Sequence, residues 1–188
     1  MSYIIISTSK KGNSVSNYFF ALAEELVNRK HNVLLLIDGK HKNIEKPQNN
    51  PAILTWPSKR PTKWKDAKFF IDLLNKLSPD CIIGNFGATN LVTILGWAYS
   101  VKHRIAWYHT LSSQLYSDST NSKCKNYLLR LRKRFVYFLA TQIVTNSKAS
   151  AFDIQKTYGI LPEKCSLLPW LIADPMPFLN KNFNRKKY

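Results

Sequence analysis

Cysteine and long apolar runs are scarce in this sequence, and each shortage excludes a class of protein. The three cysteines lie far apart, and none forms a C-x-x-C pair or stands beside a histidine at metal-ligand spacing. We therefore expect reduced thiols in a cytoplasmic protein. No apolar run approaches the roughly 20 residues of a membrane-spanning helix, and Met1 leads directly into a strand pattern, so neither a spanning helix nor a secretion signal is expected. The cysteines are Cys81, Cys124 and Cys165.

Motifs for several enzyme classes are also missing. The sequence has no H-E-x-x-H, P-loop, G-x-S-x-G or Cys–His pairing, so metal-dependent hydrolysis, NTP hydrolysis and acyl transfer have no support. Only six glycines are present, and the segment 11–16, where NAD binding would need G-x-G-x-x-G, contains Gly12 alone. Asp38 ends the second apolar segment, where it is either a ribose ligand or an ordinary strand-end carboxylate.

Acidic residues are few, because 11 Asp and Glu stand against 28 Lys and Arg, and the formal charge is +17. This charge favours an anionic partner, which is nucleic acid, a phospholipid surface or a phosphorylated substrate. Nucleic acid is the least supported of these, because none of the RRM, KH or zinc patterns is present.

A basic helix predicted over residues 127–140 is the expected contact with a membrane. We predict that cations on and just before this helix, joined by Lys63 and Lys65, bind the inner face of the plasma membrane peripherally. A solvated outer face is the alternative. The predicted patch consists of Lys123, Lys125, Arg130, Lys133 and Arg134. The same helix has an apolar stripe predicted to face the core, which consists of Leu128, Leu131, Phe135 and Phe138.

Apolar strand patterns alternate with helical patterns along the chain. Such alternation predicts right-handed βαβ units and a Rossmann-like, doubly wound parallel sheet of about seven strands, an α/β fold. We assign residues 1–170 to this domain and 171–188 to a basic, linker-like tail. The predicted strands span 3–8, 33–37, 52–56, 81–83, 104–108, 142–145 and 165–168. The predicted helices lie between 14 and 28 and over 64–77, 89–101, 127–140 and 147–157.

Ligands of such sheets bind at the carboxyl ends of the strands. Four loops are expected to converge there, at 11–12, 84–87, His109 and 146–147. The first of them joins a strand to a helix, so its backbone N–H groups and the helix dipole favour a phosphate. Simpler structural roles stay open. Gly12 is otherwise only a turn residue, His109 a buried strand end, and Ser147 first of all a helix cap.

Several local patterns together resemble one known family. These are the loop 10–14 before a long helix, Ser78-Pro79-Asp80 before the fourth strand, Trp107-Tyr108-His109, and the segment 144–148 followed by Tyr158-Gly159-Ile160. In their order and spacing they resemble the N-terminal domain of a glycosyltransferase family 4 enzyme, which is a retaining enzyme of the GT-B type. The resemblance covers roughly residues 3–169.

The resemblance implies an activity and a set of site residues. It implies transfer of a sugar from a nucleotide-sugar donor to a glycan or lipid-linked acceptor, as in polysaccharide biosynthesis, with retention and with neither cofactor nor metal. The histidine matching His109 contacts the donor sugar, and we treat it as catalytic. The donor phosphate is expected at Lys11, Gly12 and Asn13, and the acceptor side at Asn85, Phe86 and Gly87. Ser147 is a further residue of the cleft.

The sequence also departs from the family pattern. Gly12 stands alone where the family commonly has a glycine pair, and Pro169-Trp170-Leu171 replaces a proline-asparagine-glycine. No two glutamates have the Glu-x7-Glu spacing of the family's second domain, which binds the nucleotide sugar. We therefore expect half of an enzyme, inactive alone and completed by a domain or subunit that packs on residues 170–178. The alternative is a non-catalytic basic module that binds anionic membranes or nucleic acid.

Overall fold

A computed structural model describes residues 2–38, 51–109, 111–112 and 122–169. The predicted tail 171–188 and the predicted docking segment 170–178 lie outside these ranges. The described strands are β1 (Tyr3–Thr8), β2 (Asn32–Ile37), β3 (Ala52–Thr55), β4 (Cys81–Gly84), β5 (His103–Tyr108), β6 (Gln142–Thr145) and β7 (Cys165–Leu167). The helices are α1 (Ser14–Asn28), α2 (Trp64–Leu77), α3 (Thr89–Ala98), α5 (Lys123–Leu139) and α6 (Lys148–Tyr158), with short 3₁₀ helices η1 (Phe86–Ala88) and η2 (Pro162–Lys164). None of the helices in the described ranges is long and apolar enough to cross a membrane.

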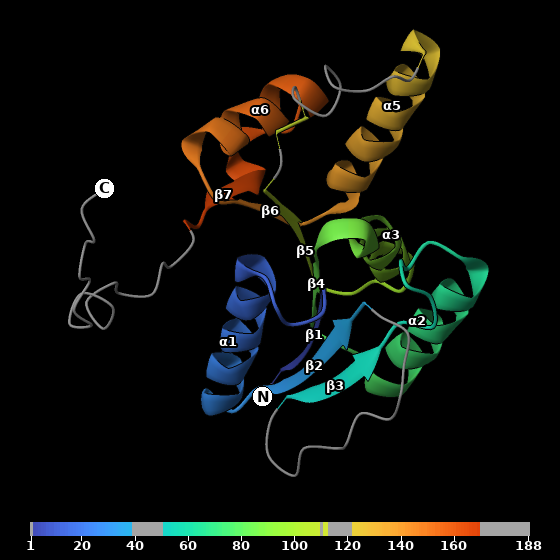
Figure 1. Ribbon diagram of the computed structural model, residues 1–188, viewed down its shortest axis with the longest axis vertical. Helices are drawn as coiled ribbons and strands as arrows, with labels where there is room; N and C mark the ends of the chain where they lie inside the picture. Colours follow the sequence, from blue (N-terminus) through green and yellow to red (C-terminus); the bar gives the residue numbers. More distant parts are fainter. Residues whose placement is uncertain (1, 39–50, 110, 113–121, 170–188) are drawn as a thin grey trace, which may run out of the picture.

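The seven strands form one parallel sheet in the order β3-β2-β1-β4-β5-β6-β7, which confirms the predicted fold class (Figure 1). Ile5 at the centre of β1 lies between Leu34 of β2 and Ile82 of β4. The chain proceeds from β1 toward one edge of the sheet and from β4 toward the other. The direction reverses between β1 and β4, and ligands of such sheets usually bind near the carboxyl ends of the strands at this point.

Alternate residues of the central strands enter different cores. Ile5 packs with Phe70 and Val92 on the side covered by α2 and α3, whereas Ile4 and Ile6 pack on the opposite side, with the buried residues of α1. These helices lie on opposite sides of the sheet in Figure 1. Because both faces are covered, the middle of each central strand is apolar at consecutive positions, and this explains the uninterrupted apolar runs in the sequence.

The buried face of α2 does not include its first residue. Trp64 begins the helix and is 82% exposed, while the fully buried Phe70 turns toward the sheet with Leu73 and Leu74. Trp64 lies in the first turn, which is fixed by a hydrogen bond from the Lys63 backbone N–H to the Asp66 carboxylate at 2.9 Å. The turn is therefore held by its cap and does not need its tryptophan in the core.

The predicted orientation of α5 is wrong. Its expected core stripe is exposed, with accessible fractions of 60% for Leu128, 43% for Leu131, 53% for Phe135 and 70% for Phe138. The opposite side packs on α3 and α6 and, through Tyr137, on β5 and β6. Its buried residues are Val136, Tyr137 and Leu139. The helix also begins earlier than predicted, because the Ser122 hydroxyl caps it by accepting the N–H of Lys125 at 3.4 Å. The apolar stripe of α5 therefore faces away from the sheet.

Candidate active site

A cavity of about 140 Å³ lies where β5 ends. Its walls come from η1, α3, β5, α5 and α6, so it joins segments far apart in the sequence. The lining residues are Phe86, Thr89, Trp107, Tyr108, His109, Ser112, Lys133, Tyr137 and Tyr158. It is mainly aromatic, with one histidine and one lysine as the groups that can carry charge.

His109 occupies the end of β5, as predicted, and meets the loop that follows β4. Its ring lies 4.7 Å from that of Phe86, centroid to centroid, at an angle of 69°. Burial, together with the charge of Lys133, lowers the pKa of His109 below its usual value. The imidazole is therefore neutral at physiological pH, and its two ring nitrogens provide one hydrogen-bond donor and one acceptor.

Lys133 lines the same cavity, although the sequence placed it on the outer side of its helix. This prediction is wrong, because Lys133 lies three and four residues before the buried Val136 and Tyr137 and so shares their face. Its ammonium nitrogen is 5.6 Å from the centre of the Tyr137 ring. Burial, with a smaller contribution from Arg132, lowers the pKa of Lys133 to about 8. No carboxylate in the described ranges forms an ion pair with it.

A buried hydrogen-bond network forms one wall of the cavity. The hydroxyls of Tyr108 and Tyr158 both contact Ser112 Oγ, each at 2.7 Å. Asp153 of α6 accepts hydrogen bonds from the Tyr108 hydroxyl and from the Ser112 backbone N–H, the latter at 2.7 Å. Burial and Asp153 raise the pKa of the Tyr108 phenol. These groups fix α6 against the end of β5, next to His109.

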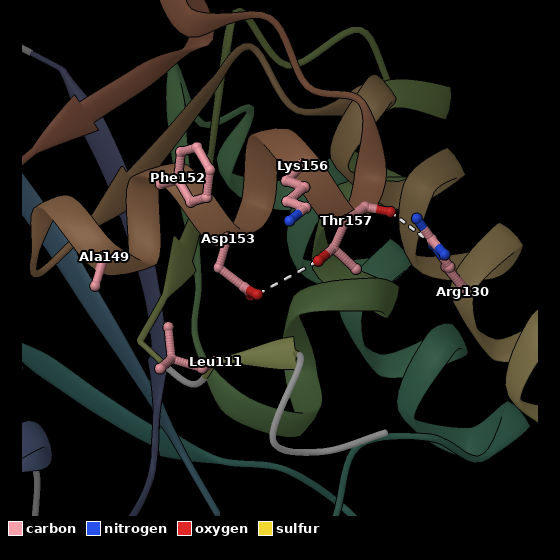
Figure 2. A pocket seen from close by; sticks show the side chains of 7 residues that line it. All are labelled: Leu111, Arg130, Ala149, Phe152, Asp153, Lys156 and Thr157. Carbon is pink, nitrogen blue, oxygen red and sulfur yellow. Dashed lines mark hydrogen bonds between the residues drawn. The ribbon is translucent and has the colours of Figure 1, made fainter. Parts of the chain in front are cut away.

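A second, more open cavity of about 540 Å³ lies beyond this network, between α5 and α6 (Figure 2). Arg130 Nε donates a hydrogen bond to the backbone oxygen of Thr157 at 2.6 Å. The Thr157 hydroxyl in turn donates to Asp153 Oδ1 at 3.3 Å. Arg130 and Lys156 give this cavity a cationic side, whereas the Asp153 carboxylate is occupied by its hydrogen bonds.

The loop after β1 is built around a helix cap. Gly12 has φ +139°, and no atom lies within 4 Å of where its side chain would be, so backbone conformation alone explains this glycine. Asn13 is the N-cap of α1. Its Oδ1 accepts the Ser16 N–H at 2.7 Å, and its own N–H donates to Ser16 Oγ at 3.2 Å. Lys11 lies over the Phe20 ring at 5.5 Å. The polar groups of Asn13 are thus engaged in the cap rather than directed at a ligand.

The loop after β4 combines one buried and two exposed residues. Asn85 is 1% exposed, its Oδ1 accepts the Phe86 N–H at 2.9 Å, and its Nδ2 donates to Thr8 Oγ1 at 3.5 Å. It therefore ties the carboxyl ends of β4 and β1 together, and its side chain is not presented to an acceptor. Phe86 and Gly87 are exposed, and Phe86 reaches His109.

Ser147 caps α6, because its hydroxyl accepts the Ser150 N–H at 3.1 Å. The structural role that the sequence predicts for it is therefore present. Within the described residues, no three His, Cys, Asp or Glu side chains lie close enough to hold a metal ion.

The sequence profile of Glycosyltransferase Family 4 matches residues 15–172. The chain belongs to this family. The matched segment includes all of α1 except Ser14, the residues that line the cavity, and the Tyr108–Asp153 network. No curated protein sequence matches the chain.

Solved structures with similar folds include nucleotide-sugar enzymes. Sucrose-phosphate synthase from Thermosynechococcus elongatus has a TM-score of 0.67 at 13% identity, over 97% of this chain and 53% of that one. Anabaena HepE in complex with UDP-glucose has a TM-score of 0.65 at 12% identity, over 92% of this chain and 44% of that one. UDP-GlcNAc 2-epimerase from Neisseria meningitidis, bound to UDP-GlcNAc, has a TM-score of 0.58 at 11% identity, over 88% and 46%.

These likenesses establish the fold, and the glycosyltransferases among the neighbours are GT-B enzymes. The chain spans about half the length of the structures named. Since an epimerase shares the fold, the fold alone indicates no activity, and membership of the family rests on the profile match.

The family 4 domain brings together only some of the predicted site residues. Phe86 and His109 line one cavity, and Lys133, Tyr108 and Tyr158 join them there without having been predicted. Gly12, Asn13 and Ser147 do not line this cavity. The position of Lys133 was detectable as a lysine on the same helical face as Val136 and Tyr137. The Tyr108–Asp153 contact joins residues 45 positions apart and leaves no local signal.

Proposed function

We propose that this domain is the acceptor-side half of a retaining glycosyltransferase, which transfers a sugar from a nucleotide sugar to a glycan or lipid-linked acceptor. One observation carries the proposal. In a member of Glycosyltransferase Family 4, a cavity lined by aromatic residues and His109 opens at the carboxyl end of β5. Such a cavity suits a sugar ring. The apolar face of the ring can stack on the aromatic walls, and a sugar hydroxyl can accept a hydrogen bond from His109.

In this proposal His109 donates a hydrogen bond to a hydroxyl of the donor sugar. Its lowered pKa supports the role, because a neutral imidazole can donate from one nitrogen and accept at the other. Lys133 supplies positive potential to the same cavity, which favours an anionic group on either substrate. The leaving diphosphate is assigned to the α1 N-terminus with Lys11 and Gly12, without a bound metal. Asn13 contributes indirectly, because it caps the N-terminus of α1 and so holds the backbone N–H groups of the first turn in place.

We propose further that the active enzyme needs a second domain, which carries the nucleotide-sugar site. The support is the comparison with longer structures, of which this chain covers 44% in HepE and 53% in sucrose-phosphate synthase. The HepE structure contains UDP-glucose, so we take UDP-sugars as the first donors to test. A longer form of this chain or a separate subunit would provide the second domain.

The test uses sugar transfer by the chain combined with candidate C-terminal domains of the family. His109→Ala should lower kcat by about 10²-fold or more if the hydrogen bond strengthens in the transition state. His103→Ala is the matched control, because His103 is exposed at the opposite end of the same strand and should leave turnover unchanged. Equal turnover in the two variants would remove His109 from the mechanism. Absence of transfer with every donor and every domain would favour the non-catalytic alternative.

A further inference from the structure

We propose that the outer face of α5 docks on an anionic membrane surface, with its apolar side chains entering the interface between headgroups and acyl chains. The α5 stripe is the set of apolar residues on this face, namely Tyr127, Leu128, Leu131, Phe135 and Phe138. This inference goes beyond the proposed function and does not depend on sugar transfer.

The first argument is exposure. Tyr127 is 61% exposed, Leu128 60% and Phe138 70%, with Leu131 and Phe135 also exposed between them. Their spacing of three and four residues places them on one helix face, so they form a continuous row. Among the described residues, the Lys164 ammonium lies over the Phe138 ring at 5.1 Å, yet Phe138 keeps its 70% exposure, and soluble monomers rarely leave such a row in water. Figure 1 shows α5, in gold, standing out at the end of the sheet.

The second argument is charge. At 100° per residue, Arg130 and Arg134 lie along one side of the stripe, whereas Lys125 and Arg132 lie along the other. The helix contains no Asp or Glu. An apolar row bordered on both sides by cations is typical of helices that lie in the plane of an anionic membrane. The core of a protein interface is usually depleted of charge, and nucleic acid would use the cations but leave the row exposed.

A cavity beside the stripe provides room for a headgroup. It measures about 250 Å³ and lies between α5 and α6. Tyr127 and Leu131 of the stripe line it together with three cations, Arg130, Arg134 and Lys156. A lipid phosphate held by these cations would bring its acyl chains alongside the stripe. The proposed contact differs from the predicted patch in two ways. Lys133 is left out because it lines the cavity next to His109, and the apolar row is placed at the centre of the contact.

Vesicle sedimentation tests the proposal with the 188-residue chain. We expect binding to phosphatidylcholine vesicles that contain phosphatidylglycerol, little binding to phosphatidylcholine alone, and weaker binding as salt increases. The double substitution Phe135→Ser with Phe138→Ser should reduce binding to the anionic vesicles by about tenfold or more. The control is Trp64→Ser, which removes an 82%-exposed aromatic residue between Lys63 and Lys65. The sequence added these two lysines to the patch, whereas this proposal leaves them out of the contact, so the variant should retain binding.

Charge is tested on the same vesicles. Arg130→Gln with Arg134→Gln should weaken binding by about fivefold for each charge removed. Lys68→Gln with Lys76→Gln removes the same charge from α2 and should have little effect. Circular dichroism would confirm that each variant is folded. If the α5 and α2 variants lost vesicle binding equally, the net charge of the protein would explain the binding, and the proposal would be overturned.

Cys124 offers a second readout on the same face, four residues before Leu128. It is exposed, whereas burial raises the pKa of the Cys81 thiol to about 11 and also raises that of Cys165. A polarity-sensitive dye on Cys124 should report an apolar environment when anionic vesicles are added. No change in emission during binding would contradict insertion.

Sedimentation velocity tests self-association as the other use of the α5 stripe. If the chain forms a dimer that the Phe135/Phe138 variant loses, and the chain does not bind vesicles, the stripe is a dimer interface and the proposal is overturned.

Discussion

Lys133 is a half-buried lysine that carries its charge into an aromatic cavity. Its ammonium group lies in an aromatic cavity near His109, and within the described residues no acidic group forms an ion pair with it. A cation held in this way destabilises the fold, because desolvation costs more than the contact with Tyr137 returns. A residue that costs stability inside a candidate site is commonly retained for the potential it provides to a ligand.

Replacing this cation should stabilise the protein. We expect Lys133→Met to raise the free energy of unfolding at neutral pH by about 1–3 kcal/mol, because it removes a desolvated charge and keeps the packing of the stem. Urea unfolding measures the change, and Lys125→Met, an exposed lysine on the same helix, is the control and should be close to neutral. A destabilised Lys133→Met protein with an unaffected control would show that the ammonium group has a stabilising partner.

The pH dependence of this effect has a definite sign. The folded state releases the Lys133 proton near a pKa of about 8, whereas an unfolded lysine retains it to about 10.4. Between these values the unfolded chain binds more protons, so the Lys133 contribution to stability rises with pH and is most unfavourable below pH 8. The stability difference between wild type and Lys133→Met should therefore shrink from pH 7 to pH 10. The substitution should also raise the pKa of His109, which NMR titration can follow.

At the scale of elements, two substitutions of Asn13 can distinguish its role as the N-cap of α1 from a role as a phosphate ligand. Asn13→Ala should cost about 1 kcal/mol in urea unfolding, because the Ser16 N–H loses its acceptor. Asn13→Asp keeps an acceptor at a positive helix end and should keep the stability. If Asn13 were solely a phosphate ligand, both variants would unfold like the wild type. In an active enzyme, Asn13→Asp should still weaken donor binding by placing a carboxylate beside the phosphate site.

The elements also show what can be predicted from sequence. Strands covered on both faces need continuous apolar runs, and the segments 3–8 and 142–145 were therefore predicted with their observed bounds. Helix faces are less certain when a helix has apolar residues on both sides. In α5 the row containing Phe135 and the row containing Val136 both have helical spacing, and only the neighbouring sheet decides which one is buried. The predicted row was the exposed one.

The candidate site was predictable in the same partial way. Parallel strands place their carboxyl ends at one edge, so the meeting of His109 with the loop containing Phe86 followed from the strand pattern. The inward position of Lys133 depends on the rotation of α5. The buried network around Asp153 depends on how α6 packs against β5. Both are tertiary contacts between distant segments, and the local sequence does not encode them.

At the scale of the whole molecule, the described chain is one parallel sheet, and its candidate site lies at the carboxyl end of β5. In the proposed function, donor and acceptor are held between two such domains. The structures that this chain resembles are about twice its length, since it covers 44% to 53% of them. A single domain can hold one substrate but cannot orient it against the other. Orientation of two reactants accounts for several kcal/mol of barrier lowering in enzymes.

We therefore expect that the 188 residues alone do not transfer sugar. Their affinity for nucleotide sugars should be lower than that of a complete enzyme by about 10²-fold or more. Calorimetry with a panel of nucleotide sugars measures the affinity, first on the chain alone and then after adding candidate C-terminal domains of the family. Each C-terminal domain by itself is the control, and it should bind donor without transferring it. Membrane docking by α5 should be present in every preparation that contains the 188 residues, because it needs no donor. Tight donor binding or turnover by the isolated chain would contradict the half-enzyme interpretation.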